Sequence, residues 1–384
     1  MKFLLAPDSF KESMTAKEAA DAMERGIKKV IPYAECVKVP MADGGEGTVQ
    51  SLVDATEGEL YKVLVKGPLG DEVEATFGVL GDKKTAVIEM ASASGLHLVP
   101  REKRNPLLTT TYGTGELIKA ALDKGVNHLI IGIGGSATND GGAGMIQALG
   151  GKLLTLDNEE INLGGGYLNL LHKIDLEGLD KRLKGIKIEV ACDVNNPLTG
   201  KNGASHVFGP QKGATDDIVK ILDENLSHYA KTIKKQLGMD IEGIPGAGAA
   251  GGLGAGLLAF FSAELKRGIE LVTEHTKLKE KMLYADYVFT GEGSIDAQTL
   301  YGKTPLGVAL IAKEYNIPVI AFAGRIGDGI VDLYEHGINS IIGILSEADT
   351  IEKALKKGPE NIERTCENIA RIILLCNSQR SKDK

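Results

Sequence analysis

The sequence predicts two α/β domains, one built on a mainly parallel Rossmann- or flavodoxin-like sheet and a second, inserted in it, with a mixed sheet. Three observations support this fold class. The chain has 384 residues, more than one hydrophobic core usually serves. Short apolar runs alternate with amphipathic helical patterns, which is typical of α/β proteins with a parallel sheet. Residues 59–90 instead show period-two segments broken by turns, which indicates an antiparallel meander.

The individual elements follow from these patterns in chain order. Thr15 and Glu18 have the spacing of a capping box, which predicts the start of the first helix, and Asp140 is expected to begin a short helix of small residues. The predicted strands are 2–6, 35–40, the segments of the meander on either side of turns at 68–71 and 81–84, 130–133, 187–191, 286–289, 319–323 and 339–345. The predicted helices are 16–29, 48–55, 116–122, 216–236, 253–265, 305–313 and 359–376.

The strand count indicates how the domains divide. Neither the two strands at the beginning nor the three at the end make a satisfactory sheet alone, but together they make one of ordinary size. We therefore expect residues 1–65 plus 285–384 to form the parallel-sheet domain, residues 66–284 to form the inserted domain, and the active site to lie in the interdomain cleft. Two contiguous domains divided near residue 200 are the alternative layout.

Composition limits the partners and the compartment. The net charge of −8 argues against nucleic acid or an anionic membrane, and no apolar stretch approaches the ~20 residues that span a bilayer. The four cysteines form no CxxC pair, and the apolar run at the start is too short for a signal peptide. We therefore expect a cytoplasmic protein; the sequence leaves a homo-oligomer open.

Polar, glycine-containing loops follow the predicted strands. In GGSATNDGG at 134–142, the glycines let backbone N–H groups turn towards an anion. Ligands of open α/β sheets bind at the carboxyl ends of strands, so these loops together predict one ligand site. The other four loops are PDSFKES at 7–13, ADGGEGT at 42–48, ACDVNNPLTG at 191–200 and TGEGSIDAQT at 290–299.

The same loops carry acids and lysines. Carboxylates beside anion-binding loops suggest Mg²⁺ with phosphate, although each aspartate alone also suits a helix cap or a turn. Lysines there can neutralise phosphate oxygens during transfer, or can simply be solvated. The acids are Asp8, Asp43, Glu46, Asp140, Asp193, Glu292 and Asp296, and the lysines are Lys11, Lys201, Lys212 and Lys303.

Three other patterns leave alternatives open. GIGGSA at 132–137 matches a dinucleotide-binding fingerprint, so an NAD-dependent oxidoreductase of a small hydroxy acid is one alternative function. A non-enzymatic module that senses a phosphorylated metabolite is another, and it would need the glycine loops but not the carboxylates. GAGAAGGLGAG at 246–256 is either a phosphate cradle or a place of tight helix packing. Gly302-Lys303-Thr304 imitates a P-loop, but Ala297 stands where a P-loop requires glycine.

Seven blocks of the sequence, in order from residue 1 to about 375, resemble the motif series of the bacterial type-1 glycerate kinases. They are PDSFKES, MADGGEGT, TTTYGTGE, GIGGSATNDGG, CDVNNPLTGKNGASHVFGPQKGA, GAGAAGGLGAG and TGEGSIDAQTLYGKTP. The resemblance implies ATP-dependent phosphorylation of D-glycerate, most often at the 2-hydroxyl, with Mg²⁺. It also implies a two-domain α/β kinase with one domain inserted in the other.

On this basis we assign hypothetical roles to single residues. Asp193 orients or deprotonates the substrate hydroxyl, and Lys11 or Lys212 stabilises the transferring phosphoryl group. The nucleotide phosphates are assigned to Gly134, Gly135, Ser136, Gly291 and Gly293, the substrate to Asp8, Ser92, Ser94 and Thr111, and Mg²⁺ to Asp43 and Asp296.

Overall fold

The computed structural model describes residues 1–380, and the chain divides into two compact units. Unit 1 comprises Met1–Asp43, Gln50–Thr56 and the chain from Ile269 onwards. Unit 2 comprises Gly44–Val49 and Glu57–Gly268. Each unit has its own sheet and its own hydrophobic core.

Unit 1 is built on a five-stranded sheet in which every neighbouring pair is parallel. The order is β13-β12-β11-β1-β2, so strands from the end of the chain continue the sheet that the first two strands begin. This confirms that the two ends of the sequence pool their strands in one parallel sheet. The strands are β1 (Lys2–Pro7), β2 (Glu35–Lys38), β11 (Tyr287–Ile295), β12 (Val319–Ile326) and β13 (Ser340–Gly343).

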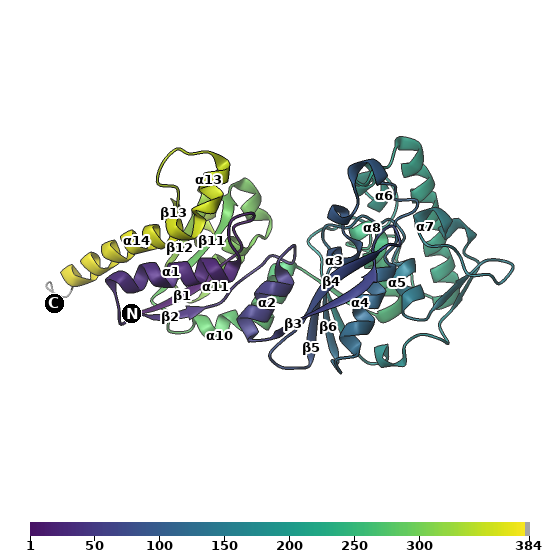
Figure 1. Cartoon of the computed structure of the whole chain (residues 1–384), viewed down its shortest axis with the longest axis horizontal. Helices are drawn as coiled ribbons and strands as arrows, with labels where there is room; N and C mark the ends of the chain where they lie inside the picture. The colour runs from purple at the N-terminus through teal and green to yellow at the C-terminus, as the bar shows by residue number, and fades with distance from the viewer. Residues whose placement is uncertain (381–384) are drawn as a thin grey trace. The chain divides into compact units, whose positions relative to one another are not determined.

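The first helix of unit 1 begins at the predicted capping box. Thr15 Oγ1 accepts a hydrogen bond from Glu18 N, and the Glu18 carboxylate accepts one from Thr15 N. Helices α1 and α14 pack so closely that a Cβ on Gly26 would lie 2.2 Å from Glu363 O (Figure 1). The helices that fall wholly or mostly in unit 1 are α1 (Ala16–Val30), α2 (Thr48–Thr56), α9 (Gly268–His275), α10 (Leu278–Met282), η6 (Ala297–Tyr301), α11 (Thr304–Glu314), α12 (Val331–Glu335), α13 (Ile351–Lys356) and α14 (Gly358–Arg380).

Unit 2 is built on the predicted mixed sheet. Its order is β10-β9-β6-β5-β4-β3, with β10, β9, β6 and β5 parallel and β4 and β3 antiparallel at one edge. The antiparallel strands are the predicted meander. The strands are β3 (Glu59–Lys66), β4 (Glu72–Val79), β5 (Thr85–Glu89), β6 (His128–Gly132), β9 (Lys187–Ala191) and β10 (Glu264–Lys266), with β7 (Lys152–Leu154) and β8 (Lys173–Asp175) as a separate ribbon.

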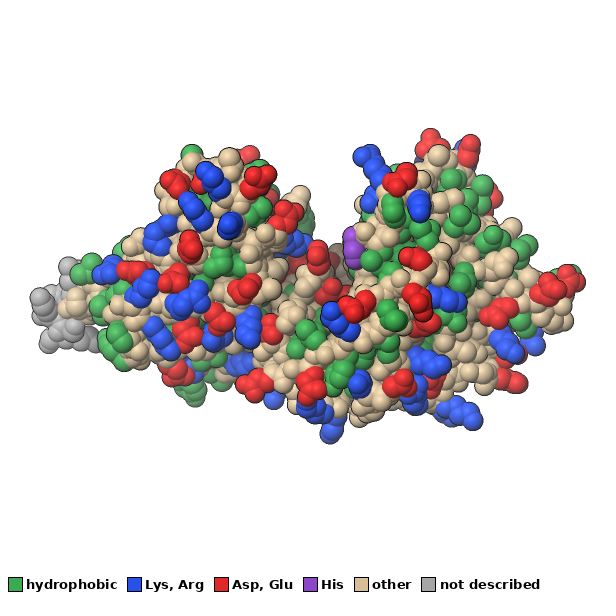
Figure 2. Space-filling model, in the orientation of Figure 1, with side chains coloured by type: hydrophobic (Ala, Val, Ile, Leu, Met, Phe, Trp, Pro, Cys, Tyr) green, Lys and Arg blue, Asp and Glu red, His purple; other side chains and the backbone are tan. Residues whose placement is uncertain are grey.

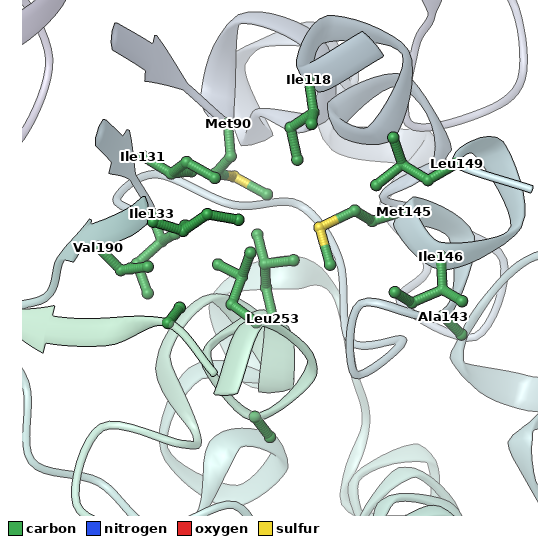
Figure 3. Close-up of a cluster of buried hydrophobic side chains, with 14 of the residues drawn as sticks. Met90, Ile118, Ile131, Ile133, Ala143, Met145, Ile146, Leu149, Val190 and Leu253 are labelled. Carbon is green, nitrogen blue, oxygen red and sulfur yellow. The ribbon is translucent and has the colours of Figure 1, made fainter. Parts of the chain in front are cut away.

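The core of unit 2 lies between its central strands and its helices. Figure 3 shows Ile131 and Val190 in one cluster with Met145 and Leu253, and these four side chains are fully buried. The cluster therefore fixes α5 and α8 against the sheet close to the ends of β6 and β9. The helices of unit 2 are α3 (Ala91–Ser94), η1 (Leu96–Leu98), η2 (Arg101–Lys103), α4 (Tyr112–Leu122), α5 (Ala143–Ala148), η3 (Gly165–Leu170), η4 (Lys181–Leu183), α6 (Ala204–Phe208), η5 (Pro210–Lys212), α7 (Asp216–Leu237) and α8 (Ala249–Phe261).

Several predicted helices differ in extent from those observed; the helix predicted over 116–122, for example, already begins at Tyr112. The helix expected to begin at Asp140 begins at Ala143, because Gly141 and Gly142 have φ values of +63° and +80°, outside the helical region. The helix predicted over 253–265 ends at Phe261, where Ser262 turns into the left-handed region. The three residues of β10 then pair with β9, a strand that the apolar pattern did not separate from the helix.

The units also differ in their bounds from the predicted domains of 1–65 plus 285–384 and 66–284. The structure divides the chain after residue 56 and after residue 268, and it places residues 44–49 in unit 2. The reason at the first boundary is strand pairing, since β3 bonds along its whole length to β4.

Charged side chains of both signs share the surface of unit 1. On the face shown in Figure 2, Lys and Arg side chains lie among Asp and Glu side chains in the region of α1 and α14. Arg25 pairs with Glu363, and Lys38 pairs with Asp21. Among the residues that the structure describes, no helix combines the length and apolarity needed to cross a membrane.

Candidate active site

The turn after β6 presents backbone groups at the surface of unit 2. Gly134 and Gly135 are exposed, and Gly135 has a φ of +71°, a conformation that favours glycine. A Cβ on Gly134 would lie 3.9 Å from Gly45, so the ADGGEGT loop lies beside this turn. The structure thus brings together two of the predicted anion-binding loops.

Asp140 anchors the far end of that loop from inside. Its carboxylate is fully buried and accepts hydrogen bonds from the backbone N–H groups of Thr111, Gly142 and Gly144 and from Thr111 Oγ1. Burial raises the pKa of this carboxyl, and the hydrogen bonds partly offset that effect. Asp140 therefore ties α4 to the start of α5, which is a structural function.

Lys212 lies beneath the same loop. Its side chain is 1% exposed, and its Nζ donates to Ser136 Oγ at 2.7 Å and to Thr138 O at 2.6 Å. Burial lowers the pKa of this ammonium group to about 7, and the charge of Asp140 partly offsets that effect. Lys212 thus contacts the loop from within unit 2, and does not present its ammonium group at the surface.

The three hydroxyls assigned to the substrate already have partners within unit 2. Ser94 is fully buried against Thr114, and Thr111 is fully buried against Asp140. Ser92 is partly exposed, and its Oγ accepts a hydrogen bond from Thr76 N. Of the three, Ser92 alone combines partial exposure with a hydroxyl proton that can be donated to a ligand.

Asp193 lies at the end of β9, at the same edge of the sheet as the glycine turn. Its side chain is exposed, and Oδ1 accepts a hydrogen bond from Gly268 N at 3.0 Å. A Cβ on Gly44 would lie 3.5 Å from Asp193 Oδ2 and 2.6 Å from the Cα of Gly268. The loops after β9 and β10 therefore meet the ADGGEGT loop here, and glycine at 44 makes that approach feasible.

The second glycine-rich segment of unit 2 serves packing. Gly251 has a φ of +67°, and a Cβ on it would lie 1.9 Å from Thr138 O. A Cβ on Gly254 would lie 2.4 Å from Gly246 O, and one on Gly256 would lie 2.5 Å from Gly141 O. Of the two alternatives for residues 246–256, the structure favours tight packing, which supports the 134–142 loop from behind.

Unit 1 carries an acidic cluster formed by Asp8, which follows β1, and Glu292, which lies in the second half of β11. Thr304 Oγ1 donates to Asp8 Oδ2, Thr299 Oγ1 donates to Glu292 Oε1 at 2.9 Å, and Lys303 Nζ lies 3.5 Å from Glu292 Oε2. Burial, then the charge of Asp43, raises the pKa of Asp8 to about 6. Burial raises the pKa of Glu292 to about 7, although Lys303 opposes it.

Asp296 caps a helix next to this cluster. Its side chain accepts a hydrogen bond from Gln298 N and forms a capping box with Thr299, which begins η6. This is the capping alternative for an aspartate in a loop.

The remaining predicted residues of unit 1 lie along β1 and β11. Lys11 is exposed in the turn after β1, and a Cβ on Gly293 would lie 3.6 Å from its backbone N. Gly291 is buried: its O accepts from Asp8 N, and a Cβ would lie 2.3 Å from Phe322 O. Gly293 therefore faces the Lys11 turn, whereas Gly291 permits close strand packing.

Sequence reasoning missed Thr304 and gave Glu292 no role beyond its membership of the set of loop carboxylates. Asp8 and Thr304 are separated by 296 positions, so no local pattern reveals their hydrogen bond. The weak signal for Glu292 was its place in the loop predicted to follow the strand at 286–289, the same kind of signal that pointed to Asp8; in the structure β11 continues to Ile295 and contains Glu292.

These features define a class of α/β protein with anion-binding turns and buried acids at the carboxyl ends of parallel strands. The sequence model described as the glycerate kinase family matches residues 3–374. The chain therefore belongs to the glycerate kinase family, which confirms the resemblance and makes the protein an enzyme of the kinase class.

Individual relatives match over nearly the whole chain. A glycerate kinase of Bacillus subtilis is 58% identical over 98% of this chain and 99% of its own length. A glycerate 2-kinase of Escherichia coli is 54% identical over 98% of both chains. A crystal structure of a protein assigned as glycerate kinase 2 from Salmonella typhimurium LT2 is 51% identical, covers 98% of this chain and 99% of its own, and superimposes with a TM-score of 0.91.

Proposed function

We propose that this protein transfers the γ-phosphoryl group of ATP to the 2-hydroxyl of D-glycerate, giving 2-phosphoglycerate and ADP. The observation that carries the proposal is the family match over residues 3–374, combined with an exposed glycine turn where β6 ends. The glycerate 2-kinase name of the Escherichia coli relative supports the choice of hydroxyl.

The glycine turn of unit 2 is proposed to bind the phosphates of ATP. Gly134 and Gly135 are exposed, and backbone N–H groups in such a turn can donate to phosphate oxygens without Cβ hindrance. Ser136 adds a hydroxyl at the base of the turn. Lys11, exposed after β1, is proposed to stabilise the transferring phosphoryl group, with Gly293 behind it.

Asp193 is proposed as the group that orients or deprotonates the substrate hydroxyl. Its exposed carboxylate lies at the same edge as the glycine turn, and the bond from Gly268 N fixes its rotamer. For the substrate carboxylate we retain Ser92, because Ser94 and Thr111 are fully buried. That the active site forms in the interdomain cleft remains a prediction.

The carboxylates of unit 1 are proposed to bind Mg²⁺. Burial is the main cause of the raised pKa values of Asp8 and Glu292, and a neighbouring carboxylate adds to the effect at each; a divalent cation would favour their ionised forms. Asp43 and Asp296 remain the residues proposed to hold the ion, with Asp8 and Glu292 as neighbouring carboxylates. Mg²⁺ would neutralise charge on the phosphate oxygens of the nucleotide.

The proposed location is the cytoplasm, which the four free cysteines support. A homo-oligomer remains a prediction.

ADP release measured with ATP, Mg²⁺ and either D- or L-glycerate tests the proposed function. We expect rapid ADP release with D-glycerate and only background hydrolysis without it. Release of ADP that does not depend on glycerate, or on any related hydroxy acid, would contradict the proposal.

A further inference from the structure

The contact between Lys212 and Ser136 places a buried charge directly under an exposed turn. Lys212 is 1% exposed, and Ser136, which receives its hydrogen bond, is 7% exposed. The two residues before Ser136 are exposed glycines. Among the described residues, Lys212 is the only hydrogen-bond partner of the Ser136 hydroxyl. The Ser136 hydroxyl therefore lies between the buried ammonium group and the exposed part of the proposed phosphate-binding turn.

The hydrogen-bond directions allow the charge to act at that surface. An ammonium group only donates, so Ser136 Oγ must accept from Lys212 Nζ when the lysine is charged. The hydroxyl proton of Ser136 then points to another acceptor. Thr138 O accepts a second hydrogen bond from Lys212 Nζ, which fixes the ammonium group in place.

We propose that Lys212 binds the nucleotide phosphate through Ser136: the ammonium group donates to Ser136 Oγ, and the Ser136 hydroxyl donates outward to a phosphate oxygen. The proposal rests on the proposed function, because it takes ATP as the ligand of this turn. Lys212 is then a positioning residue, and Ser136 is the residue that touches the nucleotide.

The arrangement predicts that phosphate binding and protonation of Lys212 are coupled. Burial lowers the pKa of Lys212 to about 7 when no ligand is bound. A phosphate held through Ser136 favours the charged form, so its binding must raise that pKa. Asp140 faces the lysine, Tyr229 of α7 faces Asp140, and Arg104 donates to the backbone oxygen of Gln211 beside it. Of these, Asp140 alone shifts the pKa of Lys212, and its effect opposes that of burial.

Isothermal titration calorimetry of the full chain with ATP tests this coupling. The titration is made at pH 8, where the γ-phosphate is already ionised, in two buffers of different ionisation enthalpy. We expect the wild type to take up close to one proton per ATP bound, roughly the change from a mostly neutral to a mostly charged Lys212. ATP binding without proton uptake would overturn this inference and leave the proposed function standing. Absence of ATP binding would overturn the proposed function itself.

Four variants locate the effect. Lys212→Met should bind ATP without proton uptake, because methionine cannot be protonated. Lys212→Arg should also bind ATP without proton uptake, because arginine is already charged. Ser136→Ala should weaken ATP binding about tenfold and lose most of the uptake, because the hydroxyl that connects charge and phosphate is gone. Lys220→Met, on the exposed face of α7, is the control and should keep the wild-type uptake. Unchanged uptake in Lys212→Arg or Ser136→Ala would overturn the inference even if Lys212→Met failed to fold.

Discussion

At the scale of single residues, Asp140 holds more of the site together than its sequence context suggests. Asp140→Ala should lower the free energy of unfolding by roughly 3 kcal/mol, because it leaves several buried N–H donors without an acceptor. The midpoint of thermal or urea unfolding measures the effect. Asp157→Ala, at an exposed turn position, is the matched control. Equal midpoints for the two variants would show that Asp140 does not anchor the loop.

Asp193, in contrast to Asp140, should contribute to catalysis and little to the stability of the fold. Asp193→Asn should reduce kcat about 10²–10⁴-fold, the usual contribution of a positioned base, with an unfolding midpoint close to that of the wild type. Steady-state kinetics with D-glycerate, together with thermal unfolding, separates the two effects. A near-normal kcat in the folded variant would remove Asp193 from the mechanism.

The buried Lys212 also predicts how stability depends on pH. Its pKa is lowered to about 7 in the folded chain, so the unfolded chain binds more protons between that value and the ordinary lysine value of 10.5. Stability contributed by this site must therefore rise with pH across that window. Relative to Lys212→Met, the wild type should gain about 2 kcal/mol between pH 7 and pH 9. Urea unfolding at both values measures this gain, and a constant difference would contradict it.

At the scale of elements, the glycines of α8 allow its backbone to pack closely against neighbouring loops. Gly251→Ala should destabilise the protein by at least about 2 kcal/mol, because the residue has a positive φ and no room for a Cβ beside Thr138 O. Gly243→Ala, where a Cβ meets nothing within 4 Å, is the control. Thermal unfolding of both variants checks the prediction; a Gly251→Ala protein as stable as its control would return residues 246–256 to the phosphate-cradle hypothesis.

Elements with strong periodicity could be predicted from the sequence, whereas those set by backbone approach could not. The capping box of α1 and the antiparallel β3 and β4 follow from local residue patterns. The start of α5 depends on the left-handed conformation of Gly142, which the surrounding packing imposes. Strand β10 is three residues long and is a strand only because it pairs with β9. The apolar pattern does not show this pairing, so the helix prediction over 253–265 extended into it.

At the scale of the whole molecule, counting strands was enough to predict that the two ends of the chain share one parallel sheet. The same rule of strand ends pointed to the loops of Asp8, Gly134 and Asp193. The sequence could not predict which loop side chains are available to a ligand, because that depends on which of them are buried in the folded chain. Lys212 and Thr111 look like loop residues available to a ligand, and both are buried against backbone and side-chain partners.

The central claim, that this chain is a kinase acting on the 2-hydroxyl of D-glycerate, is tested most directly by identifying the product. The wild-type protein is incubated with ATP, Mg²⁺ and D-glycerate, and the product is examined by ³¹P and ¹H NMR. We expect a single phosphate ester whose phosphorus couples to the proton on carbon 2. An ester at carbon 3, or no phosphorylated acid at all, would contradict it.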